Sequence, residues 1–174
     1  MVRRPRNSSL DPRYLIPTKK FPASVMVWAC FSFNGLSKLC FIDGTMDHRK
    51  YIDVLNQNLI PFIEKYHNDG NLIYQEDNAP DHKHRNVRNW LNDKRINTLD
   101  WPAQSPDMNP IENLWHYLKM KVKKYHSKNK KELIMNLKKV WDNEIPDDLL
   151  KNLALSIVNR ANSCKNSRGG PIDY

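Results

Sequence analysis

The order in which strand-like and helix-like stretches alternate sets the strongest limit on the fold of this chain. Two runs rich in β-branched and aromatic residues flank Asn34-Gly35, a dipeptide typical of tight β-hairpins. Short apolar runs at 72–77 and 96–102 each follow a segment with a helical period. Further amphipathic stretches fill the C-terminal part. This order predicts an α/β protein with a mixed sheet flanked by helices and a helical C-terminal tail.

Two prolines mark where the expected helices bend or begin. Apolar residues recur with a helical period from Asp47 to Lys65, and Pro61 within this stretch predicts a kink or a short second helix. Asn109-Pro110 combines an N-cap side chain with proline at the first helical position. We therefore expect a helix to begin there.

The composition is that of a globular, basic chain. With 174 residues, 40% of them hydrophobic, the chain is long enough to bury a core. The formal net charge of +9 favours nucleic acid as a partner, with a merely solvated basic surface as the alternative. Three cysteines without CxxC spacing predict reduced thiols rather than a disulfide framework. The longest apolar run is too short to span a bilayer, so we expect no membrane partner.

The first residues differ from the rest of the chain. Residues 1–23 are polar, carry four prolines and show no clear period. We therefore expect an extended basic arm over 1–23 and a single domain over 24–174.

Asp77 and Glu112 are the candidate catalytic and metal-binding residues. Asp77 ends the predicted strand at 72–77, whereas Glu112 falls in the first turn of the helix that follows Asn109. The carboxyl ends of parallel strands meet at one edge of a sheet, so the two carboxylates can converge there. Hard divalent ions such as Mg²⁺ prefer carboxylate oxygens. Two local roles are alternatives: an Asx turn at Asp77, and capping or dipole stabilisation by Glu112.

Longer phrases around these two acids resemble the catalytic domain of Tc1/mariner-type DNA transposases. They are QEDNAPDH, which contains Asp77, and LDWPAQSPDMNPIENLWHYLKMKV, which contains Glu112. SVMVWACFSFNG, FIDGTMD, YIDVLNQNLIPF and the terminal RGGPIDY are similar to that family in the same order. The resemblance implies an RNase H-like fold for 24–174 and an acidic DDE triad. Asp77 matches its second acid and Glu112 its third, with 34 residues between them.

The resemblance also implies a reaction, a cofactor and a partner. The family cuts DNA at transposon ends with a metal-activated water and then joins the freed 3′-hydroxyl to target DNA. Mg²⁺ or Mn²⁺ is the implied cofactor and DNA the implied partner. The reduced thiols and the polar N-terminus predict the cytosol or the nucleus, and of these we expect the nucleus for a protein of this family. Two ions that activate a nucleophile and stabilise a leaving oxygen usually need at least three carboxylates.

The family's first acid and its N-terminal helix-turn-helix region have no counterpart in this sequence. In the family, the first acid lies upstream of the segment that this chain matches. We therefore expect a truncated catalytic domain that binds the metal weakly and is inactive on its own. Asp11 and Asp43 are the candidate substitutes, but Asp11 falls in the arm and Asp43 precedes Gly44 in a turn. Neither is expected to bind a catalytic metal.

A missing first strand would also affect the sheet. In the RNase H-like strand order that the resemblance implies, this strand lies at the centre, between the hairpin and the strand at 72–77. Its absence would leave two unpaired edges, and each buried backbone group without a partner costs about 1–3 kcal/mol. We expect either direct closure of the two halves or self-association through the open edges.

A lysine-rich stretch beyond Glu112 is the candidate DNA-binding surface. Leu118, Val122 and Tyr125 keep an apolar face, which predicts an amphipathic basic helix that runs into a linker. Such a surface neutralises phosphates without reading sequence, although a solvated surface is the alternative for any single lysine. The seven lysines, called the basic cluster below, are Lys119, Lys121, Lys123, Lys124, Lys128, Lys130 and Lys131.

Three functional hypotheses fit the sequence. The leading one is a truncated Tc1/mariner transposase catalytic domain that retains two acids of a metal site and a DNA-binding surface. The alternative is a domesticated, non-catalytic nucleic-acid-binding protein, and the third is a nuclease that has recruited a new acid. His82 is expected to be structural or to face DNA, because a carboxylate site for Mg²⁺ does not favour imidazole ligands.

Overall fold

The computed structural model describes residues 24–102, 105–167, 170 and 172. The predicted arm at 1–23 lies outside these residues. Strands and helices alternate as the sequence predicts, and the α/β class is confirmed. In chain order the elements are β1 (Met26–Trp28), β2 (Phe31–Ser32), β3 (Gly35–Leu36), β4 (Cys40–Ile42), α1 (His48–Val54), the π-helical turn η2 (Leu55–Leu59), α2 (Ile60–Tyr66), β5 (Ile73–Tyr74), α3 (Arg85–Asp93), β6 (Asn97–Thr98), α4 (Pro110–Lys123), α5 (Lys130–Asn143) and α6 (Asp147–Asn166).

The hairpin predicted at Asn34-Gly35 is confirmed. β2 and β3 pair antiparallel with Ser32 opposite Gly35, and β1 and β4 continue the antiparallel arrangement. Gly35 has a φ of +155°, and a Cβ at this position would lie 2.7 Å from the ring of Tyr66. The backbone conformation of the hairpin therefore favours glycine there, and a side chain at this position would displace the Tyr66 ring.

The strands form three separate pairs instead of one sheet. Within the described part of the chain, β1 bonds to β4, β2 to β3, and β5 to β6 in parallel. No ladder joins the β1–β4 pair to the β5–β6 pair there, so on the described backbone β1 and β5 each have a ladder partner on one side only. Of the two expected outcomes, direct closure of the halves is therefore wrong.

The predicted strands at 72–77 and 96–102 are wrong in length. Only Ile73–Tyr74 and Asn97–Thr98 form ladder pairs. A strand persists where a neighbour satisfies its backbone groups, and β5 has such a neighbour on one side only. Beyond the ladder, Leu99 N donates to Tyr74 O at 2.9 Å, and the Asn78 side chain donates to Trp101 O at 2.7 Å.

A widened helical turn accommodates Pro61, where a kink or a second helix was predicted. α1 passes into η2, which ends just before α2, and Pro61 occupies the first turn of α2. Proline has no N–H to donate to the carbonyl four residues earlier, so the α-helical hydrogen bond cannot form at that point. The π-helical turn lies where that bond would be missing.

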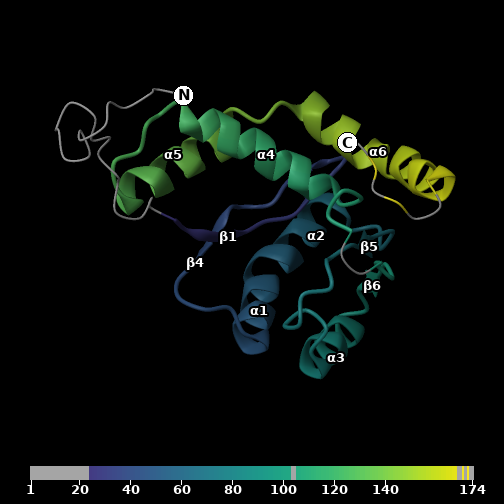
Figure 1. The fold of residues 1–174 in the computed structure, drawn as a ribbon. Coiled ribbons are helices and arrows are strands. Elements are labelled where there is room, and N and C mark those ends of the chain that lie inside the picture. Colours follow the sequence, from purple (N-terminus) through teal and green to yellow (C-terminus); the bar gives the residue numbers. More distant parts are fainter. Residues whose placement is uncertain (1–23, 103–104, 168–169, 171, 173–174) are drawn as a thin grey trace, which may run out of the picture.

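Two apolar cores lie on opposite sides of the hairpin strands. Figure 1 shows α4, α5 and α6 above β1 and β4, and α1 and α2 below them. In the core on the side of α4, α5 and α6, which is called the first core below, Trp141 donates from Nε1 to Ser37 O at 2.9 Å. This bond ties α5 to the hairpin. The first core is built around Ala29, Leu39, Leu114, Leu118, Val122, Leu137, Val140, Trp141, Leu150 and Leu153. The second is built around Tyr51, Leu55, Leu59, Tyr74, Val87, Leu91 and Ile96.

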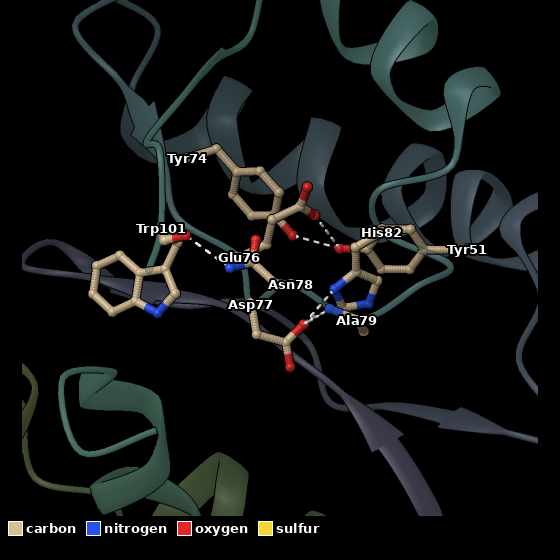
Figure 2. A network of polar contacts seen from close by, with 8 residues as sticks. All are labelled: Tyr51, Tyr74, Glu76, Asp77, Asn78, Ala79, His82 and Trp101. Carbon is tan, nitrogen blue, oxygen red and sulfur yellow. Dashed lines mark hydrogen bonds and ion pairs between the residues drawn. The ribbon is translucent and has the colours of Figure 1, made fainter. Parts of the chain in front are cut away.

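The second core contains a buried carboxylate. Tyr51, which is fully buried, donates from its hydroxyl to Glu76 Oε2 at 2.7 Å, and its oxygen lies 3.0 Å from that of Tyr74 (Figure 2). Glu76 is only 7% exposed. Burial raises the pKa of the Glu76 carboxyl above its ordinary value.

The start of α4 is fixed as predicted and is also tied to α6. The Asn109 side chain accepts a hydrogen bond from Ile111 N at 3.3 Å, which confirms the predicted N-cap. Arg160 of α6, 1% exposed, donates to Asp107 O and to Asn113 Oδ1. The buried guanidinium therefore holds both the loop before α4 and the first turns of the helix.

The three cysteines are free, as predicted. Burial raises the pKa of the Cys30 thiol to about 12, so this group stays neutral at physiological pH. Among residues 24–102 and 105–167, no helix combines the length and the apolar character needed to cross a membrane.

The raised pKa of Glu76 predicts a pH-dependent effect of Glu76→Gln. Folding favours the protonated carboxyl, and the stability that this form contributes is lost as the pH rises through the folded pKa. An amide keeps the acceptor for Tyr51 and carries no charge. We expect Glu76→Gln to raise the melting temperature at pH 7.5 and to have little effect at pH 4. Glu64→Gln, at an exposed position, is the control; a lower melting temperature of Glu76→Gln at pH 7.5 would contradict the prediction.

Candidate active site

A cavity of about 730 Å³ lies between the hairpin strands, the β5 segment and the start of α4. Val27 and Trp28 of β1 line it on one side, and Ile73 of β5 lines it on another. Asp77 and Glu112 both line this cavity. The structure thus brings the two predicted acids to the wall of one space, although their role as metal ligands stays a prediction.

Asp77 lies three residues beyond β5, and its side chain is 60% exposed. Its Oδ1 accepts a hydrogen bond from Ala79 N at 3.0 Å, so the Asx turn considered as an alternative is present. The same oxygen lies 2.7 Å from His82 Nδ1, a close contact that does not have the geometry of a hydrogen bond (Figure 2). Both contacts use Oδ1, which leaves Oδ2 for a ligand.

Glu112 is the third residue of α4 and is exposed. Its backbone N donates to Asn109 O at 3.1 Å, as expected for the first turn of a helix. Within the described part of the chain, its carboxylate takes part in no hydrogen bond or ion pair, so the capping bond considered as an alternative is not formed. Its place at the helix N-terminus still favours its negative charge.

The two carboxylates are the type of ligand that a hard divalent ion prefers, but they are fewer than the three carboxylates expected for a two-ion site. Carboxylate oxygens are what Mg²⁺ and Mn²⁺ prefer, with water and phosphate completing the shell. Among the residues that the structure describes, no three His, Cys, Asp or Glu side chains are grouped to hold a metal ion. Of the two candidate substitutes, Asp11 lies outside the described residues. Asp43 is 97% exposed, lies 3.5 Å from Lys130 Nζ and does not line the cavity.

A buried carboxylate, Glu76, lies next to Asp77 and was not predicted from the sequence. Glu76 and Tyr51 were not singled out, and His82 was expected only to be structural or to face DNA. The structure stacks the His82 ring on Tyr51, with centroids 4.0 Å apart, and sets His82 against Asp77 (Figure 2). One signal was available: Glu76 is a charged residue at the end of an apolar run and directly precedes the candidate catalytic acid.

The basic cluster covers the C-terminal half of α4, the following loop and the start of α5. Lys121 is half-buried over the Tyr117 ring, and the other six lysines are exposed. Leu118 and Val122 are buried, as the predicted apolar face requires, and Tyr125 is half-buried. The predicted helix ends at Lys123, and Lys124 forms its C-cap.

Comparisons with known proteins agree with this arrangement. A family model described as DDE superfamily endonuclease matches residues 6–134. The transposase of transposable element Tcb1 from Caenorhabditis briggsae is 36% identical in an alignment 178 positions long that covers 99% of this chain and 63% of that protein. The transposase of transposable element Tc1 from Caenorhabditis elegans is 33% identical with the same coverage. The chain therefore spans 63% of the length of these curated relatives.

Solved structures of Mos1 mariner transposase share the fold. The Mos1 catalytic domain matches with a TM-score of 0.78 at 19% identity, over 87% of this chain and 78% of that chain. The mariner Mos1 paired end complex with Mg matches with a TM-score of 0.74 at 19% identity, over 98% of this chain and 52% of that chain. The RNase H-like fold is thereby confirmed. The family model and the relatives together show that this chain belongs to the DDE superfamily endonucleases, as a catalytic-domain sequence of the Tc1/mariner transposase type.

Proposed function

We propose that Asp77 and Glu112 are the second and third acids of a DDE transposase active site and hold a divalent metal ion during DNA cleavage and strand transfer. One observation carries this proposal. Both carboxylates line the same cavity, and each keeps an oxygen that no described residue bonds. The metal in the Mos1 complex and the transposases among the relatives support the same role.

Mg²⁺ or Mn²⁺ is the proposed cofactor. When bound, such an ion lowers the pKa of a water molecule and stabilises charge on phosphate oxygens. Asp77 would supply Oδ2 and Glu112 either oxygen, while waters and DNA phosphates fill the remaining positions. Two carboxylates hold one such ion weakly, and a two-ion site calls for a third carboxylate in addition to this pair.

The 174-residue polypeptide by itself is predicted to bind Mn²⁺ weakly and to leave DNA intact. Asp77→Ala and Glu112→Ala should each weaken Mn²⁺ binding, measured from the paramagnetic resonance signal of the free ion. Asp43→Ala, outside the cavity lining, is the matched control. Supercoiled plasmid incubated with the chain and Mg²⁺ or Mn²⁺ should stay supercoiled, because loss of charge stabilisation in a transition state commonly costs several kcal/mol, and about 1.4 kcal/mol is tenfold in rate.

Two results would contradict this prediction. Mn²⁺ binding that is unchanged in both Asp77→Ala and Glu112→Ala would remove the proposed metal site. Nicking that disappears in these variants would show that a substitute acid completes the site, and Asp43→Ala would then be the first variant to test.

We also propose that the basic cluster binds DNA through its phosphates and that the protein acts in the nucleus. Lys119 and Lys123 lie seven and eleven residues beyond Glu112, which places all three on one face of α4. All three are exposed. Duplex DNA along this face would therefore run toward the Glu112 carboxylate, and a phosphate-mediated contact is independent of base sequence.

Salt dependence tests this surface. Because bound lysines release counterions from the phosphates, affinity should fall steeply with salt. Lys119→Gln combined with Lys123→Gln should reduce the slope of log K against log salt by about two. Lys151→Gln with Lys165→Gln removes the same charge from exposed positions on α6 and should change the slope less. Equal effects of the two pairs, or a preference for transposon-end sequence, would contradict a sequence-independent surface on α4.

We further propose that the open edges of β1 and β5 mediate self-association. Met26 of β1 and Ile73 of β5 are 47% and 64% exposed at these edges. Buried polar atoms without a partner in the described structure, Gln75 Nε2 and Glu76 Oε1, belong to residues that line the same cavity. An added strand would supply partners both to the edges and to such groups.

Sedimentation at increasing protein concentration tests the association. The parent chain should form dimers or larger species, and Ile73→Lys should shift them toward monomer by placing a charge on the β5 edge. Leu155→Lys is the control, since Leu155 is 63% exposed and belongs to the helix α6 rather than to a strand edge. A monomeric parent chain, or an equal effect of Leu155→Lys, would contradict the proposal.

A further inference from the structure

The backbone around Asp77 does little to fix its carboxylate. The β5 ladder ends at Tyr74, so Asp77 lies on irregular backbone, and its side chain is 60% exposed. A side chain in such a position samples several rotamers unless other groups restrain it. Metal affinity falls when a carboxylate must first be ordered, because that conformational entropy is lost on binding.

Two groups restrain the carboxylate, and both act on the same oxygen. Ala79 N donates to Oδ1, and His82 Nδ1 lies 2.7 Å from it. The Ala79 bond is local and closes the Asx turn. The His82 contact, in contrast, comes from a side chain that is itself held in place by the second core.

The His82 ring packs against Tyr51 of the second core. The His82 side chain is 20% exposed, and its ring stacks on Tyr51 at a centroid distance of 4.0 Å and an interplanar angle of 18°. Tyr51 is fully buried, and its hydroxyl donates to Glu76. Figure 2 shows the resulting chain of contacts, from the buried tyrosine through the histidine to the exposed carboxylate.

We infer that His82 is a positioning residue for Asp77: held by its stack on Tyr51, it fixes Oδ1 so that Oδ2 is presented to a divalent metal ion. This inference rests on the proposed function of Asp77 as a metal ligand. His82 acts through Asp77 and does not itself bind the ion. Groups that orient ligating carboxylates commonly change metal affinity about 10–100-fold when they are removed.

Two substitutions separate positioning from packing. His82→Phe keeps a ring to stack on Tyr51 but has no nitrogen facing Asp77. His82→Asn gives up the ring but places an amide N–H donor near the position of Nδ1. If His82 positions Asp77, the Phe variant should bind Mn²⁺ more weakly than the Asn variant. If His82 only packs against Tyr51, the Asn variant should bind Mn²⁺ more weakly than the Phe variant, because the Phe variant preserves the packing.

The test is Mn²⁺ binding by the 174-residue chain in the absence of DNA, with thermal melting of each variant in parallel. We expect His82→Phe to weaken binding about tenfold without lowering the melting temperature. His82→Asn should stay within about threefold of the parent chain, even if it melts earlier. His116→Phe, at an exposed position on α4, should bind as the parent does.

The outcomes distinguish this inference from the proposed function. If Asp77→Ala and Glu112→Ala weaken binding while His82→Phe does not, the metal site stands and the positioning role of His82 is wrong. If His82→Asn binds more weakly than His82→Phe, the histidine is structural, and the inference is again wrong. If binding does not depend on Asp77, the proposed metal site fails and this inference fails with it.

Discussion

Apolar packing, rather than a continuous sheet, holds the two halves of this protein together. In the described structure no backbone ladder runs from the β1–β4 pair to the β5–β6 pair. Trp28 and Cys30, at and just after the end of β1, pack instead against the core that contains Tyr51 and Tyr74. Apolar burial is non-directional, whereas a ladder fixes register. The halves can therefore stay joined while a cavity remains open between them, and both candidate acids lie on its wall.

The two acids are consequently held by different means. Glu112 belongs to a helix whose first turn is capped by Asn109 and tied to α6 by Arg160, so its backbone is fixed by regular structure and a buried cation. Asp77 lies beyond the last ladder pair of β5, and its orientation depends on side-chain and turn contacts. If the two acids bind a metal ion, we expect its affinity to depend most on changes around Asp77, whose backbone is the less restrained of the two.

The sequence predicted features that depend on neighbouring residues and missed those that depend on distant ones. The hairpin at Asn34-Gly35 and the cap at Asn109 follow from local backbone chemistry, and both are confirmed. The length of β5 depends on which strands flank it, so an apolar run could not set its ends. The contact of His82 with Asp77 spans five residues. It still escaped prediction, because Tyr51, far away in the chain, brings the ring there.

One helix connects the candidate chemistry with the candidate DNA surface. On α4, Glu112, Lys119 and Lys123 recur at intervals that return to one face, and the intervening turns bury Leu114, Leu118 and Val122 on another. From Glu112 to Lys123 the helix rises about 16 Å at 1.5 Å per residue. This span corresponds to about five base pairs of duplex at 3.4 Å each. The positive end of the helix dipole lies at Glu112, where it stabilises a charged carboxylate, and the lysines lie toward the negative end. The same helix geometry that stabilises each charge therefore also holds the candidate acid and the candidate phosphate-binding lysines at a fixed separation.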